Sequence, residues 1–220
     1  MSARIRAPGT YSPAERRSDA AIHIAGIASA IIAVPTLITL TALWYGDTTI
    51  VAAAVIYGLS LLAMLSCSAL YNMARLPEWN AAFRRIDQSA IYLKIAGTYT
   101  PFAVLTGTHA GWFLTGVWGA ALAGISLLHL RRDGPRWPSL ALYLGIGWAG
   151  VFFGQHVFAG LTPTGFNLLL AGGLTYTAGV AFFLWESLPF HYAIWHGFVL
   201  AATWLVYAAV IAELWSRAPV

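Results

Sequence analysis

The chain has 220 residues, of which 59% are hydrophobic and 9% are charged. Soluble domains carry roughly 25% charged residues, so this composition excludes an ordinary soluble globular protein. The formal net charge is +4, but it arises from only twelve Lys and Arg residues, most of them in short turns between apolar runs. We therefore expect no nucleic-acid partner. Cys67 is the single cysteine and lies inside an apolar run, which excludes a disulfide framework and a CxxC metal motif.

Apolar runs long enough to cross a membrane follow one another along the whole chain. A helix needs about 20 apolar residues to span the hydrocarbon core, and the runs lack the period-2 alternation of a membrane β-barrel. The predicted spans are residues 20–44, 49–73, 86–106, 112–130, 139–159, 166–186 and 191–214. We predict an all-α integral membrane bundle of seven transmembrane helices. Residues 1–19 form a cytoplasmic N-terminal segment in this prediction, and residues 20–215 form the transmembrane domain.

Arginine residues indicate the orientation, because short cytoplasmic loops of membrane proteins are enriched in Lys and Arg. Ten arginines fall in alternate connections, which places all of them on one side: Arg4, Arg6, Arg16, Arg17, Arg75, Arg84, Arg85, Arg131, Arg132 and Arg136. The loops on the opposite side contain no Lys or Arg, and Arg217 alone breaks the pattern. The pattern predicts a cytoplasmic N-terminus and a C-terminus outside.

Ionisable side chains inside a span are candidate functional residues, because each costs at least about 2.5 kcal/mol on insertion scales. His23 lies within two turns of the inner side, where we interpret it as an interfacial group. A second set of residues is expected to converge near the cytoplasmic face from spans two, three and seven: Ser68, Asn72, Asp87, Tyr192 and His196. Lys94 lies two turns beyond Asp87 on the same helix face, on the order of 10 Å deeper. A buried ammonium group needs a carboxylate or a polar cavity nearby.

The polar cluster contains few side chains that can bind a metal ion. Zinc usually takes three or four protein ligands from His, Cys, Asp and Glu, and the cluster offers Asp87 and His196 alone. His191 is about 140° around the helix from His196, so the two cannot bind one ion without distortion. From the residues alone we expect no cofactor, with zinc as the less favoured alternative and His196 as its candidate ligand. We assign no catalytic residue.

Five segments of the chain carry a resemblance to a known family. They are YSPAERRSDAAIHIAG (11–26), SALYN (68–72), RRIDQSAIYLKIAGTYTPF (84–102), GLTYTAGVAF (173–182) and HYAIWHGFVLAA (191–202). In these segments the sequence resembles the hemolysin III family, the bacterial branch related to the progestin and adipoQ receptors. The resemblance implies a seven-helix fold with the N-terminus inside and a location in the plasma (bacterial inner) membrane, with membrane lipids as partners.

The resemblance also implies a polar site, from which this chain departs. In related receptors three histidines hold zinc near the cytoplasmic face, with an Asp acting through water. Ser68, Asp87 and His196 match the family pattern, but Asn72 and Tyr192 stand where two of the histidines are expected. Gln88 and Lys94 also depart from the usual residues. One hypothesis is that the Lys94 ammonium replaces the metal as the positive charge beside Asp87; the alternative is that Lys94 snorkels or faces a polar cavity.

Two classes of function remain open from the sequence. The favoured one is a non-enzymatic hemolysin III-like membrane protein with a pore, transport or membrane-homeostasis role and a degenerate metal site. The alternative is a zinc-dependent lipid amide hydrolase, or a receptor-like lipid binder, related to the progestin and adipoQ receptors. Hydrolysis is less favoured because a metal must lower the pKa of the attacking water, and Asn72 and Tyr192 are poor replacements for its ligands.

Overall fold

The computed structural model describes residues 11–74, 76–107, 110–130 and 137–219, and in this part of the chain every regular element is helical. In chain order the elements are α1 (Pro13–Tyr45), α2 (Thr48–Met73), the 3-10 turn η2 (Pro77–Trp79), α3 (Asn80–Thr106), α4 (Ala110–Leu130), α5 (Trp137–Phe153), α6 (Gln155–Ala159), α7 (Pro163–Leu184) and α8 (His191–Arg217). Six of the arginines that support the predicted orientation lie outside the described residues: Arg4, Arg6, Arg75, Arg131, Arg132 and Arg136.

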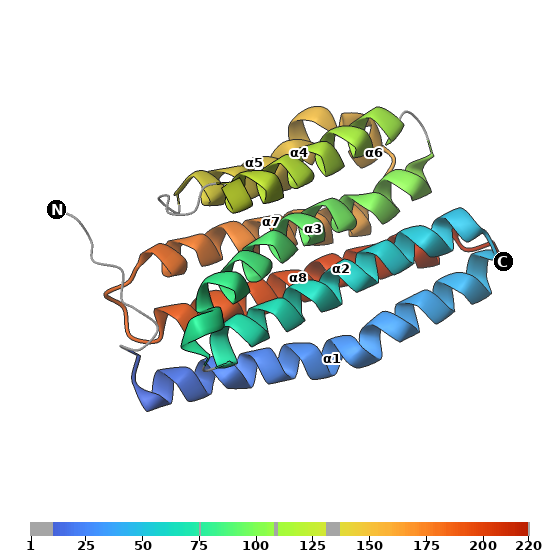
Figure 1. Cartoon of the computed structure of the whole chain (residues 1–220). Helices are drawn as coiled ribbons and strands as arrows, with labels where there is room; N and C mark the ends of the chain where they lie inside the picture. Colours follow the sequence, from blue (N-terminus) through green and yellow to red (C-terminus); the bar gives the residue numbers. More distant parts are fainter. Residues whose placement is uncertain (1–10, 75, 108–109, 131–136, 220) are drawn as a thin grey trace.

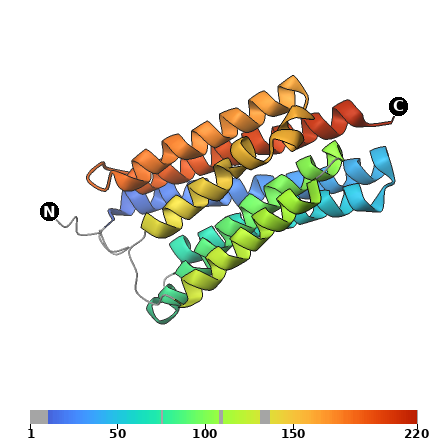
Figure 2. The ribbon, with the colours of Figure 1, turned by 90° about the horizontal axis from the view of Figure 1, so that it is seen from above.

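The long helices lie side by side with their axes close to one direction, and α1 lies at the opposite edge from α4, α5 and α6 (Figure 1). Seen from above, they form a bundle rather than a single layer (Figure 2). The most extensive contacts join consecutive helices, namely α1 with α2, α2 with α3, α3 with α4, and α7 with α8. Helix α1 also packs against α8, so the first and last helices of the chain are neighbours.

Helices α1 and α8 run parallel, because hydrogen bonds join the beginnings of the two helices to each other and their ends to each other. At the beginning of both helices, the Phe190 backbone N–H donates to Glu15 Oε1 at 3.0 Å. At their far ends, the Tyr45 hydroxyl donates to the Leu214 carbonyl at 2.7 Å. The beginning of α1 and the end of α8 therefore lie at opposite ends of the bundle, as Figure 1 also shows.

Local sequence signals define where the helices begin and end. Ser12 and Glu15 form a capping box at the beginning of α1, and Gly46 ends this helix with φ 62°, a left-handed conformation that glycine adopts without strain. Asp47 then caps α2 by accepting hydrogen bonds from the Thr49 and Ile50 N–H groups at 2.7 and 3.2 Å. The connection between the first two long helices is consequently short.

Large apolar side chains face outward from the bundle, as expected for a protein whose solvent is lipid. Ile32 is 73% exposed, Leu43 is 75% exposed and Phe152 is 69% exposed. Such extensive exposed apolar surface is rare on soluble proteins. Together with the apolar helices, it identifies an integral membrane bundle.

Five helices of the described chain are long and apolar enough to cross a membrane: α1, α2, residues Gly111–Leu130 of α4, α7 and α8. Helix α3 has 27 residues but contains Lys94 and several Tyr and Thr residues, so its composition is less apolar. Helix α5 is shorter, with 17 residues, fewer than the about 20 that a crossing takes. The predicted span over residues 139–159 is interrupted at Gly154, whose φ of −101° and ψ of 21° separate α5 from α6. Helix α1 begins at Pro13, ahead of residue 20.

Candidate functional site

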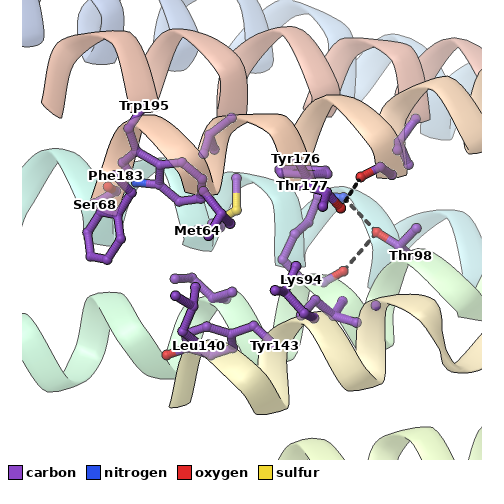
Figure 3. Close-up of a pocket in the computed structure, with 18 of the residues that line it drawn as sticks. Met64, Ser68, Lys94, Thr98, Leu140, Tyr143, Tyr176, Thr177, Phe183 and Trp195 are labelled. Atoms are coloured by element: carbon purple, nitrogen blue, oxygen red, sulfur yellow. Dashed lines mark hydrogen bonds between the residues drawn. The ribbon is translucent and has the colours of Figure 1, made fainter. Parts of the chain in front are cut away.

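A cavity of about 280 Å³ lies between the helices, lined mainly by apolar side chains from α2, α3, α5, α7 and α8. Five of the six residues of the predicted polar cluster line it: Ser68, Asp87, Lys94, Tyr192 and His196. In Figure 3, Ser68, Phe183 and Trp195 lie toward one end of the cavity, and Lys94 and Thr98 lie toward the other. The structure therefore gathers residues from spans two, three and seven around one space.

Ser68 and Asp87 form the polar contact between α2 and α3. The two side chains are partly buried, and the Ser68 hydroxyl is placed to donate a hydrogen bond to the Asp87 carboxylate. Asp87 also lies close enough to His23 and Cys67 to interact with them electrostatically. The end of the cavity that holds the Asp87 carboxylate is thus bounded by α1, α2 and α3.

Lys94 is 3% exposed and faces the cavity instead of lipid. Its ammonium donates to Thr98 Oγ1 at 2.7 Å and lies 4.5 Å from the centre of the Tyr57 ring, a distance at which the face of an aromatic ring attracts a cation. Among the described residues no ion pair joins Lys94 to Asp87. The hypothesis that Lys94 replaces a metal beside Asp87 consequently has no direct contact to support it.

Asn72 is the member of the predicted cluster that does not line the cavity. Its side-chain amide donates to the Ser68 backbone carbonyl at 2.8 Å, one turn earlier in α2. Tyr192 does line the cavity, and its ring meets the His196 ring edge-on at 4.7 Å between centroids. Of the three imidazoles that the family resemblance implies, only His196 is present. The residues at these positions do not fit the zinc ligand set of the related receptors.

A group of three ligand-type side chains occurs where α1 packs against α8. His196 Nδ1 lies 2.5 Å from Asp19 Oδ1, and His23 Nε2 lies 3.5 Å from Asp19 Oδ2. The His23 and His196 rings are 4.5 Å apart between centroids. The side chains of Asp19, His23 and His196 are 13%, 4% and 8% exposed, respectively. We refer to these three residues as the α1–α8 triad.

Two members of this triad were not assigned to the site from the sequence. Asp19 falls in the predicted N-terminal segment, and the sequence predicts an interfacial His23, whereas the structure buries His23 beside His196. The available signal was the spacing: residues four apart on a helix share a face, and Asp19 and His23 have this spacing. Their partner His196 lies 177 residues beyond Asp19 in the sequence, so only the fold could identify it.

Comparison with known proteins agrees with the sequence resemblance. Residues 15–207 match the family described as Haemolysin-III related. The chain is 39% identical to Hemolysin-3 of Bacillus cereus over 188 residues, covering 83% of this chain and 85% of that protein. It is 35% identical to the Hemolysin-3 homolog of Bacillus subtilis (strain 168) over 203 residues, covering 90% and 93% of the two chains.

A mammalian relative also matches much of the chain. Monocyte to macrophage differentiation factor of Homo sapiens is 30% identical over 167 residues, covering 70% of this chain and 67% of that protein. The matched region includes most of the helical bundle described above. On these similarities, this chain belongs to the hemolysin III family.

Proposed function

We propose that this chain is a non-enzymatic membrane protein with a membrane-homeostasis role, which it performs by holding a single-chain amphiphilic lipid in the cavity between its helices. The observation that carries the proposal is the chemistry of the cavity wall. The wall is mainly apolar, and Ser68 and Lys94 lie toward opposite ends of it (Figure 3). Asp87 lies beside Ser68 and His23, and His23 lies beside His196. Ligand sites commonly combine an apolar lining with a few polar groups that fix orientation.

The proposal includes a topology with all seven long helices crossing the plasma membrane and the N-terminus in the cytoplasm. The parallel arrangement of α1 and α8 supports an odd number of crossings, because parallel helices place the two ends of the chain on opposite sides. Helix α5 together with α6 provides enough length for one crossing. Among the described arginines, Arg16, Arg17, Arg84 and Arg85 lie in the first two turns of α1 and α3, at the ends of these helices that the topology places inside.

Arg217 is compatible with this topology despite its position outside. Its guanidinium pairs with Glu213, with Nε 3.0 Å from Glu213 Oε2. It also donates to the backbone carbonyls of Leu105 and Gly160. A paired arginine has less influence on orientation than a free cation next to the membrane.

The lipid proposal can be tested by filling the cavity. Gly147 lines the cavity, and a Cβ at this position would meet no atom within 4 Å, so Gly147→Leu places a side chain in open space. We expect this variant to weaken binding of a fluorescent long-chain fatty acid by roughly tenfold, equivalent to about 1.4 kcal/mol. Gly145→Leu is the matched control, because Gly145 lies on the same helix, is equally free of contacts and does not line the cavity. Equal binding by the two variants would contradict the proposal.

A transport role is the second candidate, favoured by the presence of both Lys94 and Asp87 in the cavity wall. Buried ionisable residues often mark ion pathways and proton relays. This candidate predicts ion or proton flux in liposomes that Lys94→Leu and Asp87→Asn reduce. Absence of flux with the unmodified protein would count against it. Lipid amide hydrolysis is the weaker proposal, since Asn72 and Tyr192 occupy the ligand positions of the related receptors.

A further inference from the structure

We propose that the α1–α8 triad, Asp19, His23 and His196, binds one zinc-type divalent cation. This donor set differs from the one implied by the family resemblance, because Asp19 and His23 belong to α1 and only His196 is shared. The proposal does not depend on the lipid role and departs from the expectation that the chain binds no metal.

The ligand types and their spacing fit zinc. Zn²⁺ is bound by imidazole nitrogen and carboxylate oxygen at about 2.0–2.2 Å. One ligand atom from each member of the triad lies within 4.8 Å of the other two. A tetrahedral ion would place these atoms about 3.3 Å apart, so side-chain adjustments on the order of 1 Å bring all three to bonding distance. The i, i+4 spacing of Asp19 and His23 resembles that of paired zinc ligands on a single helix.

The arrangement also leaves one buried ligand atom without a partner. His23 is 4% exposed, and within the described part of the chain its Nε2 atom has no hydrogen-bond partner. A buried polar atom left unpaired costs about 1–3 kcal/mol. This atom faces Asp19 Oδ2 at 3.5 Å, a distance at which the carboxylate is near but not hydrogen-bonded. A cation between the two would engage His23 Nε2, Asp19 and His196 together.

The surroundings favour a cation at this position. The Asp19 carboxylate supplies negative charge directly, and Asp87 lies close enough to His23 to interact with it electrostatically. His23 and His196 both line the cavity, so a metal held by three protein ligands would have its fourth coordination position toward that space. An open fourth position is typical of zinc sites that exchange ligands.

The folded bundle brings the ligands together before any metal binds. Helices α1 and α8 begin at the same end of the bundle, where Glu15 accepts a hydrogen bond from the Phe190 backbone N–H. This contact fixes the first turns of the two helices beside each other, and the triad lies one to two turns further along them. A preformed site of this kind binds metal without having to order the chain.

Metal titration of the full-length protein tests the proposal. Protein without an affinity tag is purified in detergent, treated with a chelator and titrated with Zn²⁺ or Co²⁺ alone. Bound metal is measured by elemental analysis after desalting, and Co²⁺ absorption reports tetrahedral coordination by nitrogen and oxygen. We expect one metal ion per chain and the spectrum of a tetrahedral site.

Substitutions in the triad should weaken this binding selectively. We expect Asp19→Asn, His23→Gln and His196→Gln each to lower metal affinity by at least tenfold, since even loss of a supporting group around a metal costs 10–100-fold. His191→Gln is the matched control: His191 is a buried histidine of the same helix as His196, 2% exposed and outside the triad. If a glutamine variant fails to fold, His196→Cys retains a zinc ligand and should retain the metal with a changed Co²⁺ spectrum.

Three results would overturn the proposal. The first is absence of metal binding by the folded, unmodified protein. The second is binding that Asp19→Asn and His23→Gln leave unchanged. The third is binding that appears only after Asn72→His and Tyr192→His are introduced together, which would assign the metal to the ligand positions of the related receptors.

Discussion

Lys94 illustrates how the tertiary structure determines the environment of a charged residue in a membrane helix. The sequence allows two interpretations, an ammonium that replaces a metal beside Asp87 or a side chain that snorkels or faces a polar cavity. In the structure its ammonium is buried in the cavity wall, with Thr98 and the Tyr57 ring as its neighbours. Neither neighbour carries a negative charge, so the ammonium lacks the compensation that an ion pair provides.

We predict that Lys94→Met increases stability. Removing a charge that is buried without an opposite charge eliminates its desolvation cost, and apolar replacement of buried charged groups is often stabilising by about 1–4 kcal/mol. Thermal unfolding in detergent measures the effect. Thr98→Val provides the opposite test, because it removes the hydrogen-bond partner and leaves the ammonium in place; we expect it to destabilise the bundle. A lower unfolding midpoint for Lys94→Met would contradict this interpretation.

The last turns of α8 carry a polar network that connects this helix to two neighbouring helices. The Glu213 carboxylate is fully buried and accepts hydrogen bonds from the Thr162 backbone N–H at 2.8 Å and from the Thr162 hydroxyl at 2.6 Å. Arg217 supplies the compensating charge, one turn further along the helix. This network connects α8 to the beginning of α7 and to the end of α3.

We predict that Arg217→Ala destabilises the protein by about 3 kcal/mol, because it leaves the charge of the fully buried Glu213 uncompensated. Replacing both residues, as in Glu213→Gln with Arg217→Ala, should cost less than the single Arg217→Ala change. Chemical denaturation followed by tryptophan fluorescence provides the measurement. Arg16→Ala is the control, since Arg16 is exposed on α1. Equal losses in the free energy of unfolding for Arg217→Ala and Arg16→Ala would show that the Glu213–Arg217 pair is not important for stability.

Close packing between α2 and α3 depends on a glycine. A Cβ on Gly97 would lie 2.8 Å from Ser60 Cβ, too close for an ordinary contact. Small residues at helix contacts allow membrane helices to approach closely. This contact supports the cavity wall, because Lys94 and Thr98 lie on the same helix as Gly97.

We predict that Gly97→Ala destabilises the bundle by about 1–3 kcal/mol through overpacking. Adding Ser60→Gly to the same chain should recover part of this loss, since it removes the atoms that the new methyl group would meet. Gly116→Ala serves as the control, as a Cβ there would meet nothing within 4 Å. Thermal unfolding of the four proteins distinguishes steric overlap from a general effect of replacing glycine in a helix.

At the scale of the whole molecule, the proposed topology can be tested by labelling single cysteines. In a Cys67→Ala background, a cysteine at Asp47 or Ala218 should react with a membrane-impermeant maleimide in intact cells. A cysteine at Glu186 should react only after the membrane is permeabilised, because the α7–α8 connection lies on the side of the N-terminus. Labelling of Glu186→Cys from outside intact cells would contradict the proposed topology.

The sequence alone determined the membrane class, the positions of the long apolar helices and the family, since each depends on local composition or on matching segments. It did not identify the break at Gly154, because a glycine is compatible with both a continuous and an interrupted helix. It also left Lys94 without a defined environment and Asp19 outside the site. Only the packing of α1 on α8 brought Asp19 and His23 to His196, because residues separated by most of the chain meet through tertiary contacts that no local pattern encodes.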